Sequence, residues 1–306
     1  MPPARLRGSI VPLVTPFADG RVDLPAFEAA VERQVHEGSD GVVVTGTTGE
    51  PTSLNAAERE ELCRRAVAVA AGRILVVAAT GSANHEETLS LTKAAAAAGA
   101  DSVLVVCPAF VKPSQDGLVE HFAAVAAVTD LPLLIYNIPG RSGVTVTAET
   151  VERIVARAPG VAGLKHASND LDLVTELLLR LGGDFRLFCG LESYSYPFLA
   201  LGGAGLMSAV GNLFPARVAR LFAHVRRGEH GAALQLHREL FRVSQAIFFD
   251  TNPVPLKAML AAQGLGSEEV RPPLAQLSAQ TRGRVMDALA ASLPAAAAGT
   301  GAVVHR

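Results

Sequence analysis

Short apolar runs alternate with longer amphipathic stretches along most of the chain. Eight of these runs are rich in Val, Ile and Leu and are almost continuously apolar, which is typical of parallel strands buried on both faces. They span residues 8–17, 41–46, 74–80, 102–108, 132–139, 161–167, 185–190 and 204–210. Because alanine-rich segments with helical spacing lie between them, the pattern predicts a repeated alternation of strand and helix.

The segments between the runs carry recognisable helix boundaries. Asn55 precedes a helical segment that has Glu58 three residues later, which predicts a reciprocal capping pair at the helix start. Asn84 and Glu87 predict the same pairing before the next helix. Glycines stand where C-terminal helix caps are expected, at Gly38, Gly72 and Gly99. These signals support helices between the strands.

Eight strands that are each followed by a helix are what a closed (β/α)8 barrel, the TIM barrel, requires. An open doubly wound sheet usually has about five or six strands, and no GxGxxG motif follows the first run. Residues 230–293 show helical pattern without strands, so we expect added helices that pack against the barrel or a second subunit. The sequence thus predicts a barrel over residues 1–227, a helical extension over 228–293 and a disordered tail over 294–306.

Composition narrows the classes of function. The 306 residues are 49% apolar but only 5% aromatic, and the formal net charge is −2. This charge gives no basis for binding nucleic acid or an anionic membrane. No apolar run approaches the roughly 18 residues of a membrane span, and the N-terminus lacks the apolar segment of a signal peptide. We therefore expect a soluble, cytoplasmic protein.

The cysteines and histidines show no spacing that suits a metal. The cysteines are odd in number and read as small buried hydrophobes in a reducing compartment; they are Cys63, Cys107 and Cys189. His85 and His166 have no partner at zinc-ligand spacing. Because neighbours on a strand point to opposite faces, His166 should face the helix layer if Lys165 points inward. We predict no metal and no cofactor.

The candidate chemistry begins with a lysine inside an apolar, strand-like run. Lys165 lies in VAGLKHA, and only four lysines occur among the 27 basic residues of the chain. Burying an ammonium group is costly, so a buried lysine tends to become neutral and nucleophilic. A neutral amine in an apolar pocket is what Schiff-base chemistry on a carbonyl substrate requires. The alternative is a lysine that ends its strand with a packed stem and its ammonium group in water.

Two other predicted strand ends carry residues suited to bind a small acid, and active sites in this fold lie at strand ends. The motif TGTTGE places Thr47 and Thr48 in a glycine-rich turn that could hold a carboxylate or phosphate. In YNIPGRSG, the Tyr136 phenol can relay protons and Arg141 can hold a carboxylate. The alternatives are an ordinary turn, a core tyrosine and a solvated arginine.

The last two strands add candidates at the same rim. CGLES, after the seventh strand, offers Gly190 and Glu192. The motif GGAGLMSAVGN lies around the eighth strand. Its glycines allow the backbone to approach a ligand closely, and it places Met207 and Ser208 at the same end of the barrel. Each signal is weak alone, but their convergence with a buried lysine favours a binding site.

In this order, the motifs resemble the pyruvate-dependent Schiff-base lyases, a family that includes 4-hydroxy-tetrahydrodipicolinate synthase and N-acetylneuraminate lyase. The resemblance covers residues from about 8 to 293 and is carried by GTTGE, PSQDG, YNIPGRSG, GLK and NPVPLK. Arg141 matches the arginine of the synthase motif YN-x-P-x-R-[ST]-G, which favours the synthase branch over the neuraminate lyases.

The resemblance implies an imine between Lys165 and pyruvate, with Tyr136 as the proton relay. We therefore assign catalysis to Lys165, Tyr136 and Thr48. Substrate binding is assigned to a wider set, namely Thr47, Thr48, Arg141, Gly190, Glu192, Met207 and Ser208. The resemblance also implies pyruvate and a small aldehyde as partners, and a homo-oligomer that is a dimer or tetramer.

Two residues depart from the synthase pattern. Synthases usually carry Pro-Tyr-Tyr after the fourth strand, and the second tyrosine crosses a dimer interface to complete a proton relay. Here Pro108 and Ala109 are followed by Phe110, which can fill that space but cannot pass a proton. The residue after the lysine is commonly acidic in synthases and is His166 here. Both departures leave the second substrate open.

We therefore expect a lyase that joins pyruvate to an aldehyde, with L-aspartate semialdehyde as the preferred substrate. One alternative is a pyruvate-releasing aldolase or dehydratase that acts on another 2-oxo acid, such as a hydroxy-oxo acid or a sugar acid. Another is a catalytically degraded barrel that binds small oxo acids.

Overall fold

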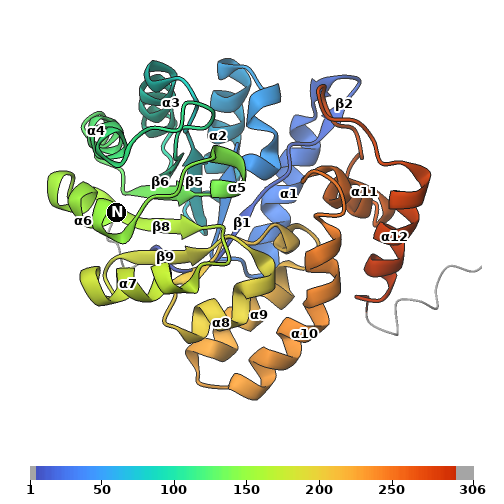
Figure 1. Cartoon of the computed structure of the whole chain (residues 1–306). Helices are drawn as coiled ribbons and strands as arrows, with labels where there is room; N and C mark the ends of the chain where they lie inside the picture. Colours follow the sequence, from blue (N-terminus) through green and yellow to red (C-terminus); the bar gives the residue numbers. More distant parts are fainter. Residues whose placement is uncertain (1–4, 294–306) are drawn as a thin grey trace, which may run out of the picture.

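The computed structural model describes residues 5–293, in which eight parallel strands close into a barrel (Figure 1). Neighbouring strands follow the order β1-β10-β9-β8-β7-β6-β5-β4. Their bounds are β1 (Gly8–Pro12), β4 (Gly41–Val44), β5 (Leu75–Ala79), β6 (Ser102–Val106), β7 (Leu133–Asn137), β8 (Val161–His166), β9 (Arg186–Cys189) and β10 (Gly205–Leu206). Each strand lies within one of the eight predicted runs, so the predicted barrel is confirmed.

Helices cover the outside of the barrel (Figure 1). Those that follow the strands are α1 (Leu24–His36), α2 (Ala56–Ala70), α3 (His85–Ala97), α4 (Gln115–Ala126), α5 (Pro139–Ser142), α6 (Ala148–Arg157), α7 (Leu171–Leu181), α8 (Ser195–Ala200) and α9 (Pro215–Arg226). No helix within residues 5–293 is long and apolar enough to cross a bilayer.

The helix caps agree with the sequence pattern in all but one detail. Asn55 and Glu58 form the predicted reciprocal pair at the start of α2. Asn84 accepts the Glu87 N–H at the start of α3, but the Glu87 carboxylate binds the Ser82 hydroxyl instead of returning to Asn84. The second half of that predicted pair is therefore wrong. The three predicted cap glycines follow α1, α2 and α3 with positive φ, and they are Gly38, Gly72 and Gly99.

After the barrel, the described chain forms three helices that lie together on one side of it (Figure 1). They are α10 (His230–Ala246), α11 (Val254–Ala262) and α12 (Ala279–Ala290). No strand occurs in residues 230–293, where the sequence has a helical pattern without strands. The predicted disordered tail, 294–306, lies outside the described residues. A short hairpin of β2 (Phe17–Ala18) and β3 (Arg21–Val22) was not predicted.

Apolar side chains form two layers, one between strands and helices and one inside the barrel. Parallel register places Lys165 on β8 beside Tyr136 on β7 and Phe188 on β9. Tyr136 and Phe188 both belong to the inner layer, so this register level points into the barrel. The next register position pairs His166 with Asn137 and points outward. The His166 Nδ1 lies 3.2 Å from Asn137 Nδ2. This confirms the predicted orientation of His166.

Candidate active site

Lys165 lies at the C-terminal end of β8 and is only 5% exposed. Its Nζ lies 4.3 Å from the centroid of the Tyr136 ring, so the amine sits against an aromatic face. The alternative of an ammonium group in open water does not fit this burial. The position fits the predicted role of a buried amine at the catalytic end of the barrel.

Gly190 leaves the space that the Lys165 side chain occupies. A Cβ at Gly190 would lie 2.7 Å from Lys165 Cε and 3.0 Å from the Ala167 Cβ. Real Cβ atoms do not approach a neighbour as closely as the first of these distances. Gly190 therefore lets the lysine reach the mouth of the barrel.

A cavity of about 80 Å³ opens beside Lys165. This is small for a ligand site, since drug-sized ligands occupy clefts of about 300–1,000 Å³. Its lining contains most of the predicted site residues together with several that were not predicted. The lining residues are Pro12, Thr47, Thr48, Tyr136, Ile138, Arg141, Lys165, Ala167, Gly190, Leu191, Glu192, Met207, Ala209, Phe248 and Asn252.

Two threonines enter the cavity on the short 3₁₀ helix η2 (Thr47–Gly49) that follows β4. The Thr47 hydroxyl lies 3.5 Å from the Tyr136 hydroxyl. The Thr48 hydroxyl is buried and accepts a hydrogen bond of 3.1 Å from Asn252 Nδ2. The sequence assigned catalysis to Thr48, but the geometry favours Thr47 as the partner of Tyr136 and gives Thr48 a fixed place in the wall.

The turn also presents backbone donors. Within residues 5–293, the amide N–H groups of Thr47 and Thr48 have no protein acceptor, whereas the next two residues donate to Gly46 and Thr47 carbonyls. Free N–H groups at the start of a tight turn attract anions. Together with the two hydroxyls, they give this wall the donors that a small carboxylate needs.

Arg141 stands at the rim of the cavity on α5. Its Nη2 donates a 3.3 Å hydrogen bond to the Asn252 carbonyl. A guanidinium has five N–H donors, so others remain for a ligand. Phe248 lines the cavity as well and comes, like Asn252, from the segment between α10 and α11. This segment was not assigned to the site, although the NPVPLK motif was noted in the sequence.

Glu192 is a buried carboxyl in the cavity wall. Its Oε1 accepts the Ala209 N–H at 2.6 Å, while Oε2 is buried without a hydrogen-bond partner in residues 5–293. Burial raises the pKa of Glu192, against the opposing effects of the Ala209 N–H and the Lys165 amine. Met207 also lines the cavity, whereas Ser208 does not line it and acts only to lower the pKa of the Glu192 carboxyl.

This raised pKa predicts a pH-dependent effect of Glu192→Gln. A carboxyl whose folded pKa exceeds the unfolded value near 4.5 destabilises the fold as pH rises from that value through the folded pKa. Glutamine cannot ionise and can still accept the Ala209 N–H. In urea unfolding across this window, the variant should therefore gain free energy of unfolding relative to the parent as pH rises. Parallel pH curves for the two proteins would contradict the assignment.

Phe110 does not line the cavity of its own chain. Its side chain is 93% exposed, and its φ of 72° lies in the left-handed region. The neighbouring Val111 is also exposed. Two adjacent apolar side chains therefore project from the loop after β6 toward solvent.

The three cysteines are buried free thiols, as predicted. Burial raises the pKa of each thiol to about 12, which makes a reactive thiolate unfavourable. Burial also lowers the pKa of His166, which packs in the outer layer. Within residues 5–293, no group of three or more His, Cys, Asp or Glu side chains is arranged to hold a metal ion.

Fold and cavity together define the class of protein. A closed parallel barrel carries a buried lysine, a tyrosine and a donor-rich turn at the carboxyl ends of its strands, where barrel enzymes place their active sites. These features are those of a (β/α)8-barrel enzyme whose candidate active site surrounds Lys165.

Comparison with known proteins gives the family. The model of the dihydrodipicolinate synthetase family matches residues 5–292. A 4-hydroxy-tetrahydrodipicolinate synthase from Thermus thermophilus is 46% identical over 280 residues, which are 91% of this chain and 94% of the relative. The structure of the synthase from Methylacidiphilum fumariolicum SolV matches with a TM-score of 0.92 and 38% identity, covering 94% of this chain and 96% of that one.

A third similar protein has been solved with a ligand. The chloride-inhibited dihydrodipicolinate synthase from Acinetobacter baumannii, complexed with pyruvate, matches with a TM-score of 0.91 and 34% identity. The match covers 94% of this chain and 99% of that one. The chain belongs to the dihydrodipicolinate synthetase family and is a lyase. This confirms the predicted resemblance, including its synthase branch.

Proposed function

We propose that this protein condenses pyruvate with L-aspartate semialdehyde through an imine on Lys165, as 4-hydroxy-tetrahydrodipicolinate synthases do. The observation that carries the proposal is the burial of Lys165 beside Tyr136 at a small cavity whose lining also supplies hydrogen-bond donors. The relatives that share the whole barrel are named as synthases of this kind.

In the proposed reaction, the Lys165 amine attacks the ketone carbon of pyruvate, and loss of water gives the imine. The imine withdraws electrons from the neighbouring methyl group, which loses a proton and becomes an enamine. The enamine carbon attacks the aldehyde carbon, and hydrolysis then releases the product and restores the amine. Tyr136 is assigned the proton transfers, because its ring lies against the Lys165 amine and its hydroxyl lies 3.5 Å from the Thr47 hydroxyl.

Two sites for carboxylates follow from the same geometry. The turn that carries Thr47 and Thr48 is assigned the pyruvate carboxylate, since it offers two amide N–H groups and the Thr47 hydroxyl. Arg141 at the rim is assigned the carboxylate of the aldehyde substrate, which it can bind with two parallel hydrogen bonds.

We also propose that the protein works in the cytoplasm as a homo-oligomer, a dimer or tetramer. The exposed Phe110 and Val111 support an interface, because adjacent apolar side chains at a loop tip are stabilised when a partner covers them. The three buried free thiols support a reducing compartment. Sedimentation equilibrium measures the assembly directly, and a monomer at micromolar concentration would contradict the proposal.

The residue at position 110 gives a prediction about rate. A synthase with Phe110 lacks one hydroxyl of the relay that the family resemblance implies, and loss of one acid–base group typically costs about 10²–10⁴-fold in rate. Phe110→Tyr should therefore raise kcat for the condensation, whereas Phe110→Leu, the matched apolar control, should not. If the tyrosine variant gains nothing with L-aspartate semialdehyde, the relay has another proton donor or the enzyme is built for another aldehyde.

A substrate panel tests the proposed function against its alternatives. The enzyme is assayed with pyruvate and a set of aldehydes with and without a carboxylate, and in the reverse direction with hydroxy-oxo acids and sugar acids. The proposal predicts the highest kcat/KM for L-aspartate semialdehyde. Faster release of pyruvate from another 2-oxo acid would instead favour an aldolase or dehydratase. Binding of oxo acids without turnover would indicate a degraded barrel.

A further inference from the structure

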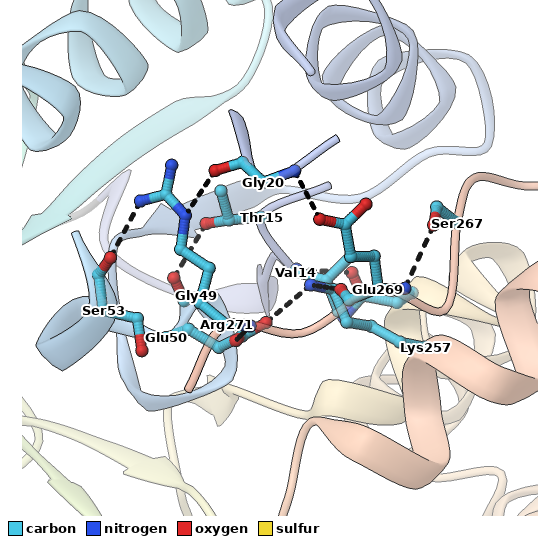
Figure 2. Close-up of polar contacts among 11 residues, drawn as sticks. Val14, Thr15, Gly20, Gly49, Glu50, Ser53, Lys257, Ser267, Glu269 and Arg271 are labelled. Atoms are coloured by element: carbon cyan, nitrogen blue, oxygen red, sulfur yellow. Dashed lines mark hydrogen bonds and ion pairs between the residues drawn. The ribbon is translucent and has the colours of Figure 1, made fainter. Parts of the chain in front are cut away.

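A second buried lysine lies outside the cavity. Lys257 on α11 forms an ion pair with Glu50, with 2.6 Å between Nζ and Oε1, and each side chain is 1% exposed (Figure 2). Position 50 directly follows the turn that carries Thr47 and Thr48, whereas position 257 belongs to the C-terminal helices. The pair therefore joins the C-terminal helices to the residue that follows the turn in the cavity wall.

Both members of the pair are fully engaged with protein groups. Lys257 Nζ also donates to the Glu269 carbonyl at 2.6 Å and lies 4.2 Å from the Phe17 ring centroid. Glu50 Oε2 accepts the Arg271 N–H at 3.3 Å (Figure 2). Neither residue lines the cavity, so neither is placed to contact a substrate. Any effect on the reaction must pass through the segments that carry them, which are the turn and the segment that contains Asn252.

The turn itself is held from several sides. Thr15 Oγ1 donates to the Gly49 carbonyl at 2.8 Å (Figure 2), and Asn252 Nδ2 donates to Thr48 Oγ1 at 3.1 Å. Asn252 and Lys257 are five positions apart in the same NPVPLK motif. One C-terminal segment thus contacts the turn at Thr48, through Asn252, and contacts Glu50, through Lys257.

Glu50 adopts a conformation that its side chain disfavours. Its φ of 55° and ψ of 50° are left-handed, a region that glycine enters readily and residues with a Cβ do not. A glycine would relax the backbone but would lose the carboxylate that reaches Lys257. A buried ion pair is also weak evidence for stability, because apolar replacements are often as stable. We therefore look for the role of the ion pair in the position that it gives to the turn, and not in the stability of the fold.

We propose that the Lys257–Glu50 pair is a positioning device for the pyruvate-binding turn, so that the C-terminal extension forms part of the active site. Through Glu50, the pair fixes the end of η2 and with it the direction of the Thr47 hydroxyl and the two free N–H groups. Both residues are positioning residues. The inference rests on the proposed pyruvate chemistry. It adds that binding of pyruvate, and not of the aldehyde, depends on the C-terminal extension.

The test compares a double variant with a matched control. Lys257→Met alone would leave a buried carboxylate without a partner and endanger folding. Glu50→Gln combined with Lys257→Met removes both charges at nearly constant volume, and glutamine can still accept the Arg271 N–H. The control is Arg217→Met, which removes an arginine on α9 that binds Glu239 on α10 and the Ser292 carbonyl after α12. Neither contact involves the turn.

The readout is the pyruvate concentration that gives half-maximal trapping of the imine by borohydride, measured beside thermal unfolding. The double variant should need about 10- to 100-fold more pyruvate, the scale on which small misplacements of binding groups act. Its KM for the aldehyde should change less than about 2-fold, because neither replaced side chain contacts Arg141. The Arg217→Met control should need the same pyruvate concentration for half-maximal trapping as the parent.

Two results would overturn the inference. One is a folded double variant with the parent's pyruvate dependence, and the other is an equal rise in the Arg217→Met control. Failure of the parent itself to trap pyruvate would instead contradict the proposed function, so the two failures are distinguishable.

Discussion

Lys165→Arg should abolish turnover while leaving the protein folded. Arginine keeps the positive charge but is not deprotonated in proteins, so it cannot attack a carbonyl. Loss of a covalent nucleophile reduces kcat by up to about 10⁶-fold. The expected result is therefore no condensation above background in a coupled assay, with a thermal unfolding transition close to that of the parent.

Lys165→Met is the companion variant, because it introduces no bulkier guanidinium beside Gly190 and Ala167. Methionine matches the unbranched stem and removes the amine. A folded Met variant that retained even about 1% of the parent kcat would contradict a covalent role for Lys165, since such a loss is far too small for removal of the nucleophile.

Arg141→Ala should raise KM for acidic aldehydes far more than KM for pyruvate. The guanidinium is the cationic group at the rim of the cavity, and a charge-assisted bidentate pair is about twice as strong as neutral hydrogen bonds. Loss of such a pair, worth about 1.5–3 kcal/mol, corresponds to roughly 10- to 150-fold in KM for L-aspartate semialdehyde. Steady-state kinetics with each substrate varied in turn measures this split.

Arg153→Ala serves as the control for this change. Its guanidinium pairs with Asp116 on the protein surface and contacts no residue of the cavity lining. Both KM values should stay at the parent level in this control. If Arg141→Ala handles L-aspartate semialdehyde as well as the parent does, the synthase assignment fails and the aldolase alternative becomes the better one.

The strands of the barrel were predictable because of where they lie. A parallel strand that packs against helices on one face and the barrel interior on the other is apolar on both faces. It can therefore be recognised in the sequence as a continuous apolar run, without knowledge of the strands that pair with it. Even β10, with only two residues in the ladder, lies inside such a run. The β2–β3 hairpin has two residues per strand and no periodic pattern, so nothing in the sequence distinguishes it from a turn.

The active site was predictable where a residue's place on its strand fixes its direction. Lys165 and Tyr136 stand at strand ends, and the register brings them side by side. Thr47 and Thr48 are adjacent in a turn, and only the geometry of η2 decides which hydroxyl meets Tyr136. Asn252 lies 204 positions from Thr48, so its contact depends on the packing of the C-terminal helices.

The second buried lysine shows the same limit of the sequence. Lys257 stands in a helical motif, where burial cannot be inferred from an apolar strand-like run. The structure nevertheless buries it more completely than Lys165. The two lysines differ in what surrounds the amine. The Lys257 amine forms an ion pair with the Glu50 carboxylate, whereas Lys165 lines a cavity. The adjacent space for a ligand therefore distinguishes the candidate nucleophile.

Trapping of the imine tests the chemistry most directly. The protein is incubated with pyruvate, reduced with borohydride, digested and mapped by mass spectrometry, with a sample reduced without pyruvate as the reference. The predicted result is a single adduct on Lys165, formed only with pyruvate and lost in Lys165→Arg. An adduct on Lys257, or an unmodified protein at saturating pyruvate, would contradict the imine mechanism.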